Sequence, residues 1–434
     1  MRLLGVLSVL ILAAGCAGPQ SEPSPTSRTD PPPTTVQGTG LTYPRTAAVY
    51  LAQDALPSIE ELARYDVVAL DNDWANRMPR SFFDELRRRN PRLTLLAYVD
   101  VVDSMRESGS YDYWRNAYQL WQISHSDPST NTFPDQWLAR TANGDPVHEW
   151  EDRVMTNLTD QAPRVDGQLF VEYAVDWIVN TVWPAGIWDG IFLDVWGERI
   201  YTADSDRWDV NRDGIDETDD QIYGPGNPLD RGLTIGEKRL RAALPDAIVV
   251  VNSDRTIRDQ LLDGRAFESF MDPAAGRDAD ADLRAYLAAA ASDDKRAPGL
   301  TLTINKNTMG PETPEALRNA RFELGATLLQ DGFWAPMGPD YGTLAYYDEL
   351  DGDGLGRGYL GYPLVANPTS PERGVFRRDF ERGIVVVNTS DVPATIPLER
   401  PFKKLKGHQD PATNDGSEVD SVTLGPRDAT ILLR

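Results

Sequence analysis

The sequence predicts an α/β protein whose main domain is a (β/α)8 TIM barrel, followed by a small antiparallel β domain. Three observations support this prediction: short apolar runs alternate with helical patterns, eight such runs precede residue 372, and the alternation then stops. Eight is the number of strands that closes a parallel barrel. An open doubly wound sheet is the alternative that shares the same alternation.

The first 42 residues precede the predicted barrel. Residues 1–15 have the pattern of a signal peptide, with an apolar stretch that is too short for a transmembrane helix and small residues before Cys16. A cysteine at that point predicts lipidation of Cys16; an ordinary signal peptide with an incidental cysteine is the alternative. Residues 16–42 are rich in Pro, Ser and Thr and predict a flexible tether. We therefore expect a protein on the extracellular face of the cell membrane, lipid-anchored or secreted.

The barrel domain is predicted over residues 43–372. Its strands are expected at 46–52, 66–71, 93–99, 190–195, 247–252, 266–271, 300–305 and 331–335. The helices between them tend to begin with acidic or capping residues and to end near basic residues, Pro or Gly. They are expected at 58–64, 80–89, 169–182, 231–244, 256–262, 280–291 and 314–330. The long connections 100–168 and 197–230 both follow strand ends, so we expect them beside the catalytic face.

The last segment, residues 373–434, lacks helical periodicity. Short β-type runs at 383–388, 394–397, 419–424 and 429–433 are separated by turn residues. This pattern predicts a small antiparallel β domain packed on the barrel.

Composition excludes several classes of function. The formal net charge of −24 argues against nucleic-acid binding, because there is no basic stripe to neutralise phosphates. With three His and no H-E-x-x-H or G-x-S-x-G sequence, a zinc hydrolase or a Ser–His triad is poorly supported. A single cysteine also rules out an intramolecular disulfide within the chain.

Two acidic residues interrupt otherwise apolar strands. Asp194 ends the run 190–195, and Glu268 lies between phenylalanines in 266–271. Cleavage of a glycosidic bond needs one protonated and one ionised carboxyl group in the same cavity. We therefore predict Asp194 as nucleophile or base and Glu268 as proton donor, with partial burial raising the pKa of Glu268. The alternative is that each acid only caps a turn or pairs with an arginine.

Further polar and aromatic residues are candidates for substrate binding. Acids at other strand ends could bind sugar hydroxyls, and tryptophans could stack on sugar rings, although some tryptophans would instead form the core of their loop. The predicted substrate-binding residues are Asp71, Asp73, Asp100, Trp150, Trp196 and Trp334.

The connection after the fourth strand contains a possible calcium loop. Residues 209–220 match D-x-N-x-D-G, with an acid at the twelfth position that is Asp rather than the usual Glu. Side-chain oxygens and one backbone carbonyl would bind a structural Ca²⁺, and a solvated acidic loop is the alternative. The predicted ligands are Asp209, Asn211, Asp213, Ile215 and Asp220.

Several segments resemble a known family, the hypothetical glycoside hydrolases of family fifteen, and more distantly the barrel of endo-α-1,4-polygalactosaminidases. The resemblance is carried by DGIFLDVW at 189–196, FESF at 267–270, the segment 346–363, RRDFERGIVVVNTS at 377–390 and the segment 410–433. It implies a barrel, a sugar substrate and an active-site acid at Asp194. We expect a polysaccharide or oligosaccharide as the partner, and contact with the membrane only through the lipid anchor. A non-catalytic carbohydrate-binding lipoprotein and an adhesive cell-envelope scaffold are the alternatives.

Overall fold

The structure, a computed structural model, describes most of the chain after residue 39. The described residues are 40–52, 54–106, 133–150, 153–252, 254–272, 276, 278–306 and 313–434, with only the backbone described for 103–106 and 150. The predicted signal peptide, Cys16 and nearly all of the tether lie outside these ranges. Lipid anchoring at Cys16 therefore stays a prediction.

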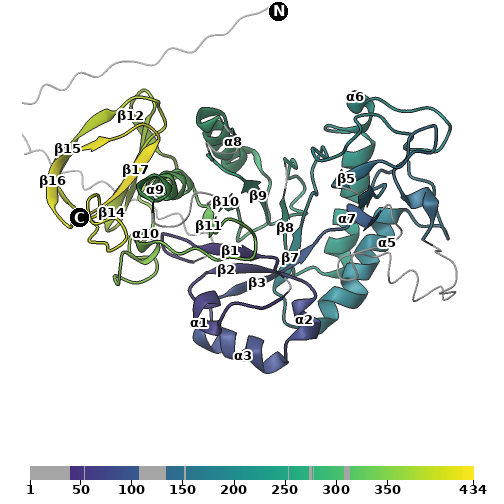
Figure 1. Cartoon of the computed structure of the whole chain (residues 1–434), viewed down its shortest axis with the longest axis horizontal. Helices are drawn as coiled ribbons and strands as arrows, with labels where there is room; N and C mark the ends of the chain where they lie inside the picture. The colour runs from purple at the N-terminus through teal and green to yellow at the C-terminus, as the bar shows by residue number, and fades with distance from the viewer. Residues whose placement is uncertain are drawn as a thin grey trace, which may run out of the picture. The chain divides into compact units, whose positions relative to one another are not determined.

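A parallel eight-stranded sheet with helices between its strands forms the larger part of the described chain (Figure 1). The strand order is β1-β2-β3-β7-β8-β9-β10-β11, so neighbours in sequence along this sheet are neighbours in space. All eight predicted barrel strands are confirmed. They are β1 (Ala47–Tyr50), β2 (Val67–Asp71), β3 (Thr94–Val99), β7 (Gly190–Leu193), β8 (Ile248–Asn252), β9 (Gly264–Glu268), β10 (Leu302–Lys306) and β11 (Phe333–Met337).

The first and last strands of this sheet meet, which decides between the barrel and the open sheet. Thr46 forms a parallel bridge with Trp334. The Trp334 N–H donates to the Arg45 carbonyl at 3.1 Å, an ordinary length for a backbone hydrogen bond. An open doubly wound sheet would leave both edges apart. The predicted (β/α)8 barrel is therefore confirmed.

Helices flank the barrel strands, as expected for this fold. They are α1 (Ile59–Leu62), α2 (Trp74–Arg77), α3 (Arg80–Arg89), α5 (Phe170–Trp177), α6 (Asp219–Ile222), α7 (Pro228–Ala243), α8 (Ala279–Ser292), α9 (Pro314–Leu328) and α10 (Asp348–Asp351). The longer ones begin as the sequence predicts, since Asp278 and Thr313 accept hydrogen bonds from the first turns of α8 and α9. None of the described helices is long and apolar enough to cross a membrane.

The predicted helix at 256–262 is wrong, because this segment forms turns. Asp259 and Gln260 both have positive φ, of 57° and 49°, which ends any right-handed helix there. Just before them, the buried Arg255 donates to Glu237 at 2.7 Å and pairs with Asp230, both on α7. This ion cluster holds the connection against α7 and takes the place of helical hydrogen bonds.

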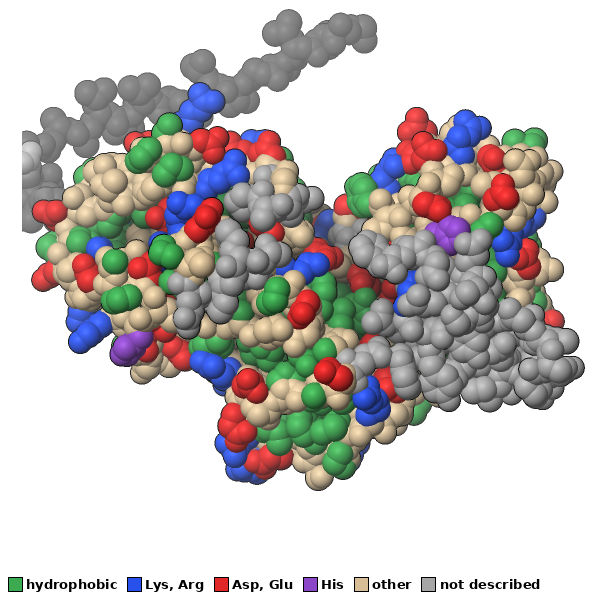
Figure 2. All heavy atoms as spheres, viewed as in Figure 1, with side chains coloured by type: hydrophobic (Ala, Val, Ile, Leu, Met, Phe, Trp, Pro, Cys, Tyr) green, Lys and Arg blue, Asp and Glu red, His purple; other side chains and the backbone are tan. Residues whose placement is uncertain are grey.

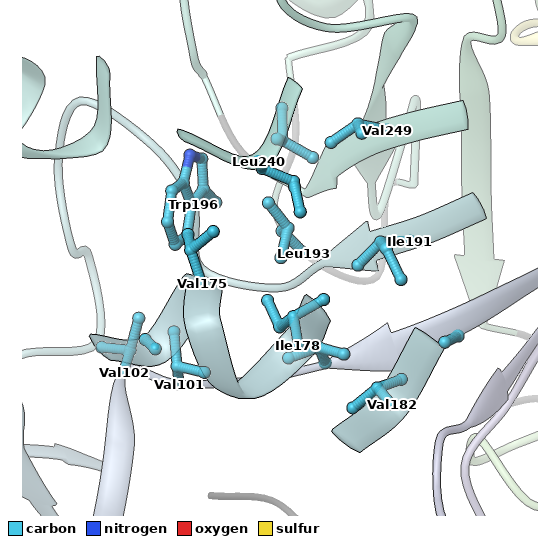
Figure 3. Packing of buried hydrophobic residues seen from close by; sticks show 14 of the residues in the cluster. Val101, Val102, Val175, Ile178, Val182, Ile191, Leu193, Trp196, Leu240 and Val249 are labelled. Carbon is cyan, nitrogen blue, oxygen red and sulfur yellow. The ribbon is translucent and has the colours of Figure 1, made fainter. Parts of the chain in front are cut away.

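A large apolar cluster fills the space between the barrel strands and the helices α5 and α7. Figure 3 shows Ile191 and Leu193 of β7 near Val175 of α5 and Leu240 of α7, with Trp196 beside them. All five side chains are buried. Side-chain burial of this kind contributes about 1.5–3 kcal/mol per large apolar residue, so β7 is firmly held in the middle of the sheet.

The second sheet is antiparallel and lies at the C-terminal end of the chain, as predicted. Its order is β12-β13-β14-β17-β15-β16. The strands are β12 (Thr369–Glu372), β13 (Val375–Phe380), β14 (Gly383–Asn388), β15 (Ala394–Lys404), β16 (Glu418–Leu424) and β17 (Asp428–Leu433). The antiparallel sheet begins at Thr369, shortly before residue 373, where the β domain is predicted to start. A Cβ on Gly325 of α9 would lie 2.5 Å from the Ala429 side chain, so glycine permits close packing of α9 on β17.

The long connection after β3 contains a small sheet of its own. Strands β4 (Asp103–Arg106), β5 (His148–Trp150) and β6 (Arg153–Met155) pair in the order β4-β6-β5. The Trp137 ring beneath them is fully buried and lies 5.6 Å from the Phe170 ring. This tryptophan therefore packs against α5 as part of the large apolar cluster.

Candidate active site

The carboxyl ends of the barrel strands surround a cleft of about 830 Å³. This volume lies near the upper end of the range for pockets that hold small ligands, about 300–1,000 Å³. Residues from the ends of β3, β7, β8 and β9 face it together with residues of the long connections. The polar lining residues include Tyr98, Asp100, Glu149, Arg153, Asp194, Arg199, Tyr201, Thr202, Asn252, Asp254, Arg265, Glu268, Asp282, Lys306 and Tyr341.

Asp194 follows directly after β7, where both of its carboxylate oxygens accept hydrogen bonds. Oδ1 accepts from Asn252 Nδ2 at 2.8 Å and from the Val195 N–H at 2.9 Å, and Oδ2 accepts from the Tyr98 hydroxyl. All of these partners are donors. They stabilise the ionised carboxylate and fix its direction in the cleft.

Glu268 is the last residue of β9 and is joined to Asp194 through a single amide group. Asn252 Nδ2, at the end of β8, donates to Glu268 Oε2 at 2.8 Å and to Asp194 Oδ1 at the same distance. The two carboxylate oxygens therefore cannot be further apart than twice 2.8 Å. The structure thus brings together the two acids that the sequence predicted as a pair.

Both acids are followed by a residue with a strained backbone. Val195 has φ of 52° and Ser269 has φ of 52°, in the left-handed region that residues other than Gly, Asn and Asp seldom adopt. For a β-branched valine this conformation is unfavourable by roughly 1–3 kcal/mol. Strain of this kind persists where the surroundings enforce it, and it often occurs at functional sites. The strained residues Val195 and Ser269 directly follow Asp194 and Glu268, so both strand ends have a feature that is common at functional sites.

The expected burial of Glu268 is wrong. Its side chain is 39% exposed, because β9 ends at Glu268 and the acid points into the open cleft. Burial acts on the other acid of the pair. It raises the pKa of Asp194, as does the negative charge of Glu268, while the hydrogen bonds from Tyr98, Asn252 and Val195 act in the opposite direction.

Two residues beyond the predicted set surround the Glu268 carboxylate. The Tyr341 hydroxyl donates to Glu268 Oε1, and burial together with the charge of Glu268 raises the pKa of Tyr341, which therefore keeps its proton. Lys306, at the end of β10, has its Nζ 3.9 Å from the same oxygen and 4.6 Å from the Tyr341 ring centroid. Glu268 thus faces a donor and a cation on one side and the Asn252 amide on the other.

The three aspartates predicted to bind substrate have different surroundings. Asp100 lines the cleft, and its Oδ1 accepts from the Val102 N–H at 2.9 Å. Asp71 is fully buried and accepts from the Asp73 N–H at 3.0 Å, and neither Asp71 nor Asp73 lines the cleft. Asp100 therefore lies in the same cleft as Asp194 and Glu268, whereas Asp71 forms part of a turn after β2.

The tryptophans predicted to bind sugar are not available as stacking platforms in the described part of the cleft. Trp196 is fully buried and its Nε1 donates to Glu237 at 3.1 Å (Figure 3). Trp334 is also buried, and its Nε1 donates to Asn305 at 3.0 Å. The side chain of Trp150 lies outside the described residues. Trp196 follows the end of β7 and Trp334 lies within β11, and both side chains are buried in the core.

The sequence matches the family described as hypothetical glycosyl hydrolase family 15 over residues 87–384. This range includes β7, β8 and β9 with both acids of the pair. The chain belongs to this family. The family resemblance seen in the sequence is confirmed, and the chain is assigned to the glycoside hydrolases.

Solved structures of glycoside hydrolases match this chain at low sequence identity. The glycoside hydrolase domain of PelA from Pseudomonas aeruginosa is 16% identical with a TM-score of 0.40, covering 69% of this chain and 97% of its own. The cyclic α-maltosyl-(1→6)-maltose hydrolase from Arthrobacter globiformis is 11% identical with a TM-score of 0.47, covering 90% of this chain and 98% of its own. A comparison with curated proteins finds no match.

The predicted calcium loop at residues 209–220 lies in the connection after β7, and its binding of Ca²⁺ stays a prediction. Asp209 accepts from the Gly214 N–H at 2.8 Å and Asp213 accepts from the Ile215 N–H at 2.9 Å, so these carboxylates bind the loop's own backbone. Asn211 Oδ1 accepts from the Asp213 N–H at 2.9 Å, and Asp220 lies in the first turn of α6. Across the described ranges, no three His, Cys, Asp or Glu side chains come together as metal ligands.

Sequence reasoning missed Asn252, Tyr98 and Tyr341. Asn252 is the last residue of a predicted strand, and Tyr98 is the last but one of another. Their positions at strand ends are the signal in the sequence that indicates both residues, since amide and phenol side chains there can face the cleft as acids do. Tyr341 follows β11 in an irregular segment, and no pattern in the sequence indicates that its hydroxyl reaches Glu268.

Proposed function

We propose that this protein cleaves O-glycosidic bonds of an extracellular polysaccharide, with Asp194 and Glu268 as its catalytic carboxyl pair. The observation that carries the proposal is the single amide of Asn252, which donates to both carboxylates at 2.8 Å. Membership of a glycoside hydrolase family supports the reaction class. The predicted signal peptide supports the extracellular location, and the cleft supports a ligand larger than one sugar unit.

The spacing of the pair favours hydrolysis with retention of anomeric configuration. Retaining glycosidases hold their carboxyl groups about 5–5.5 Å apart, whereas inverting enzymes hold them about 6.5–9.5 Å apart to admit a water molecule. Because Asn252 Nδ2 is 2.8 Å from one oxygen of each acid, these two oxygens lie at most twice 2.8 Å apart, a close approach that suits the shorter spacing. One acid would therefore attack the anomeric carbon directly, and water would then release the covalent glycosyl intermediate.

Hydrogen bonding distinguishes the roles of the two acids. The Asp194 oxygens accept from Tyr98, Asn252 and the Val195 backbone, which direct Asp194 as a nucleophile and oppose the rise in its pKa caused by burial and by the charge of Glu268. Glu268 is exposed to the cleft, where it can exchange a proton with water and deliver it to the leaving oxygen. A proton on Glu268 also removes the like charge beside Asp194 and so favours ionised Asp194.

A digestion screen followed by NMR tests this function. We expect the mature protein to release reducing ends from at least one of amylose, pullulan, dextran, xylan, mannan, galactan and chitosan. The first product seen by ¹H NMR should have the anomeric configuration of the cleaved bond. Binding without turnover would instead support a carbohydrate-binding lipoprotein, and inversion would contradict Asp194 as a nucleophile.

Replacing Asn252 by alanine should shift the pH profile of the enzyme. The Asn252 hydrogen bond lowers the pKa of Asp194, so its loss raises that pKa further. Activity requires ionised Asp194 and falls as the pH drops through this pKa. We expect the acidic limb of kcat/KM to lie above the ordinary aspartate value of about 3.9 in the wild type and to move to higher pH in Asn252→Ala. An unchanged limb would show that Asn252 does not tune the pair.

The calcium site at residues 209–220 stays a prediction, and chelation tests it. If Ca²⁺ binds, 1 mM EDTA should lower the Tm of the wild type and added Ca²⁺ should restore it, because a ligand that binds only the folded state stabilises it. Asp213→Asn should reduce this response. Equal Tm values with EDTA and with Ca²⁺ would support a solvated acidic loop.

A further inference from the structure

Tyr201 is the most exposed large hydrophobic side chain among the described residues, with 70% of its surface exposed. Of the large hydrophobic side chains that are exposed in this part of the chain, it is the only aromatic one, the others being Ile215, Leu355, Val365 and Val392. Tyr201 also lines the same cleft as Asp194 and Glu268. An aromatic ring left open to water inside a cleft offers an apolar face to a ligand.

The Tyr201 side chain is anchored through its hydroxyl, and residues on either side of it in the chain are anchored as well. Its hydroxyl donates to Asp254 Oδ2 at 2.6 Å, which joins the connection after β7 to the connection after β8. On either side of Tyr201 in the chain, Arg199 pairs with Asp219 and the Thr202 hydroxyl donates to Glu149. Because the ring is already oriented, little conformational entropy remains to be lost when a ligand covers it.

We propose that Tyr201 is the stacking platform of an outer sugar-binding subsite, which makes the enzyme prefer longer glycans. This inference rests on the proposed glycosidase function. A sugar ring has an apolar face that can cover the tyrosine and hydroxyl groups at its edge. Asp254 and Arg199, which line the cleft beside Tyr201, can form hydrogen bonds with those hydroxyl groups.

The buried tryptophans strengthen this assignment. Trp196 and Trp334 lie in the core, so neither supplies the stacking surface that the sequence suggested. The cleft, at about 830 Å³, suits a ligand larger than one hexose. A sugar unit on Tyr201 would contribute binding to long substrates but not to the shortest ones, and uniform binding of this kind acts on KM more than on kcat.

The ratio of kcat/KM for long and short substrates measures the subsite directly. The long substrate is the polysaccharide that the wild type cleaves fastest in the screen above, and the short one is the smallest oligosaccharide of that polymer that it cleaves. We expect Tyr201→Ala to lower this ratio about tenfold, mainly through a higher KM on the polymer, as loss of about 1.4 kcal/mol of binding predicts. Tyr201→Phe keeps the ring and should retain most of the ratio.

Two controls make the outcome decisive. Val392 has 63% of its surface exposed on the C-terminal β domain, so Val392→Ala removes a comparable exposed apolar group away from the cleft. It should leave the ratio unchanged, and Tyr201→Ser repeats the truncation if the alanine variant does not fold. A ratio in Tyr201→Ala or Tyr201→Ser within twofold of the wild type, or an equal fall in Val392→Ala, overturns the subsite. Absence of cleavage by the wild type would instead reject the underlying glycosidase function.

Discussion

Replacing Asp194 by asparagine is expected to lower kcat on the polysaccharide substrate by about 10⁴-fold or more, the scale seen when a catalytic nucleophile is removed. The amide is uncharged and cannot form the covalent glycosyl intermediate. Asp194 also accepts hydrogen bonds from Tyr98, Asn252 and the Val195 backbone, and an amide at this position would replace one accepting oxygen by a donor. Initial rates of reducing-end release measure the loss, with circular dichroism to verify the fold.

An exposed aspartate provides the matched control for this variant. Asp206 lies on the surface of the connection after β7, outside the cleft lining. Asp206→Asn makes the same chemical change without touching the pair and should keep wild-type rates. If Asp194→Asn retained more than a tenth of the wild-type kcat, Asp194 would be a residue that only caps its turn, as the Val195 hydrogen bond alone would allow.

Replacing Glu268 by glutamine is expected to lower kcat about 10²–10⁴-fold, the usual contribution of a general acid. The size of the loss should depend on the leaving group. A polysaccharide leaves as a poor alkoxide and needs the proton, whereas an aryl glycoside with an acidic phenol needs it less. Comparing Glu268→Gln on both kinds of substrate therefore measures proton donation itself.

A glutamate on the surface of the C-terminal β domain serves as the control here. Glu418, at the start of β16, is exposed and far along the chain from the cleft residues. Glu418→Gln should leave the rates on both substrates unchanged. Equal losses in Glu268→Gln on the polysaccharide and on the aryl glycoside would argue that Glu268 binds substrate rather than donating a proton, and the assignment of the acid would then fail.

The arrangement of the pair has an energetic cost that a purely structural site would avoid. Burial and the charge of Glu268 both raise the pKa of Asp194, which means that the ionised form is disfavoured in the folded protein. Val195 and Ser269 add backbone strain next to the two acids. Several unfavourable features concentrated at the ends of β7 and β9, on either side of β8, are typical of a functional site, where activity is favoured at the expense of stability.

The absence of nucleic-acid binding stays a prediction from the charge of the chain. On the face shown in Figure 2, basic side chains are interspersed with acidic ones over the described part of the molecule. The formal net charge of −24 has the same implication. A neutral or hydroxyl-rich substrate fits this surface better than a polyanion does.

Local sequence patterns predicted the barrel well because strand formation there depends on nearest neighbours in sequence. A strand of a parallel sheet is buried on both faces, so its residues are nearly all apolar. This composition can be recognised directly in a run such as 190–195. The helix at 256–262 was predicted incorrectly for the opposite reason. The pairing of Arg255 with Asp230 and Glu237 involves residues distant in sequence, and no local pattern reveals it.

By itself, the sequence determined the eight strands, the following antiparallel domain, and the two acids at strand ends, because each depends on periodicity or on position within a run. Only the tertiary structure decided which side chains face the cleft. The pairing of β8 with both β7 and β9 placed Asn252 between Asp194 and Glu268, while tertiary packing left Glu268 and Tyr201 exposed and buried Trp196 against α7. Exposure and hydrogen bonding depend on contacts between distant segments, so a pattern along one chain cannot specify them.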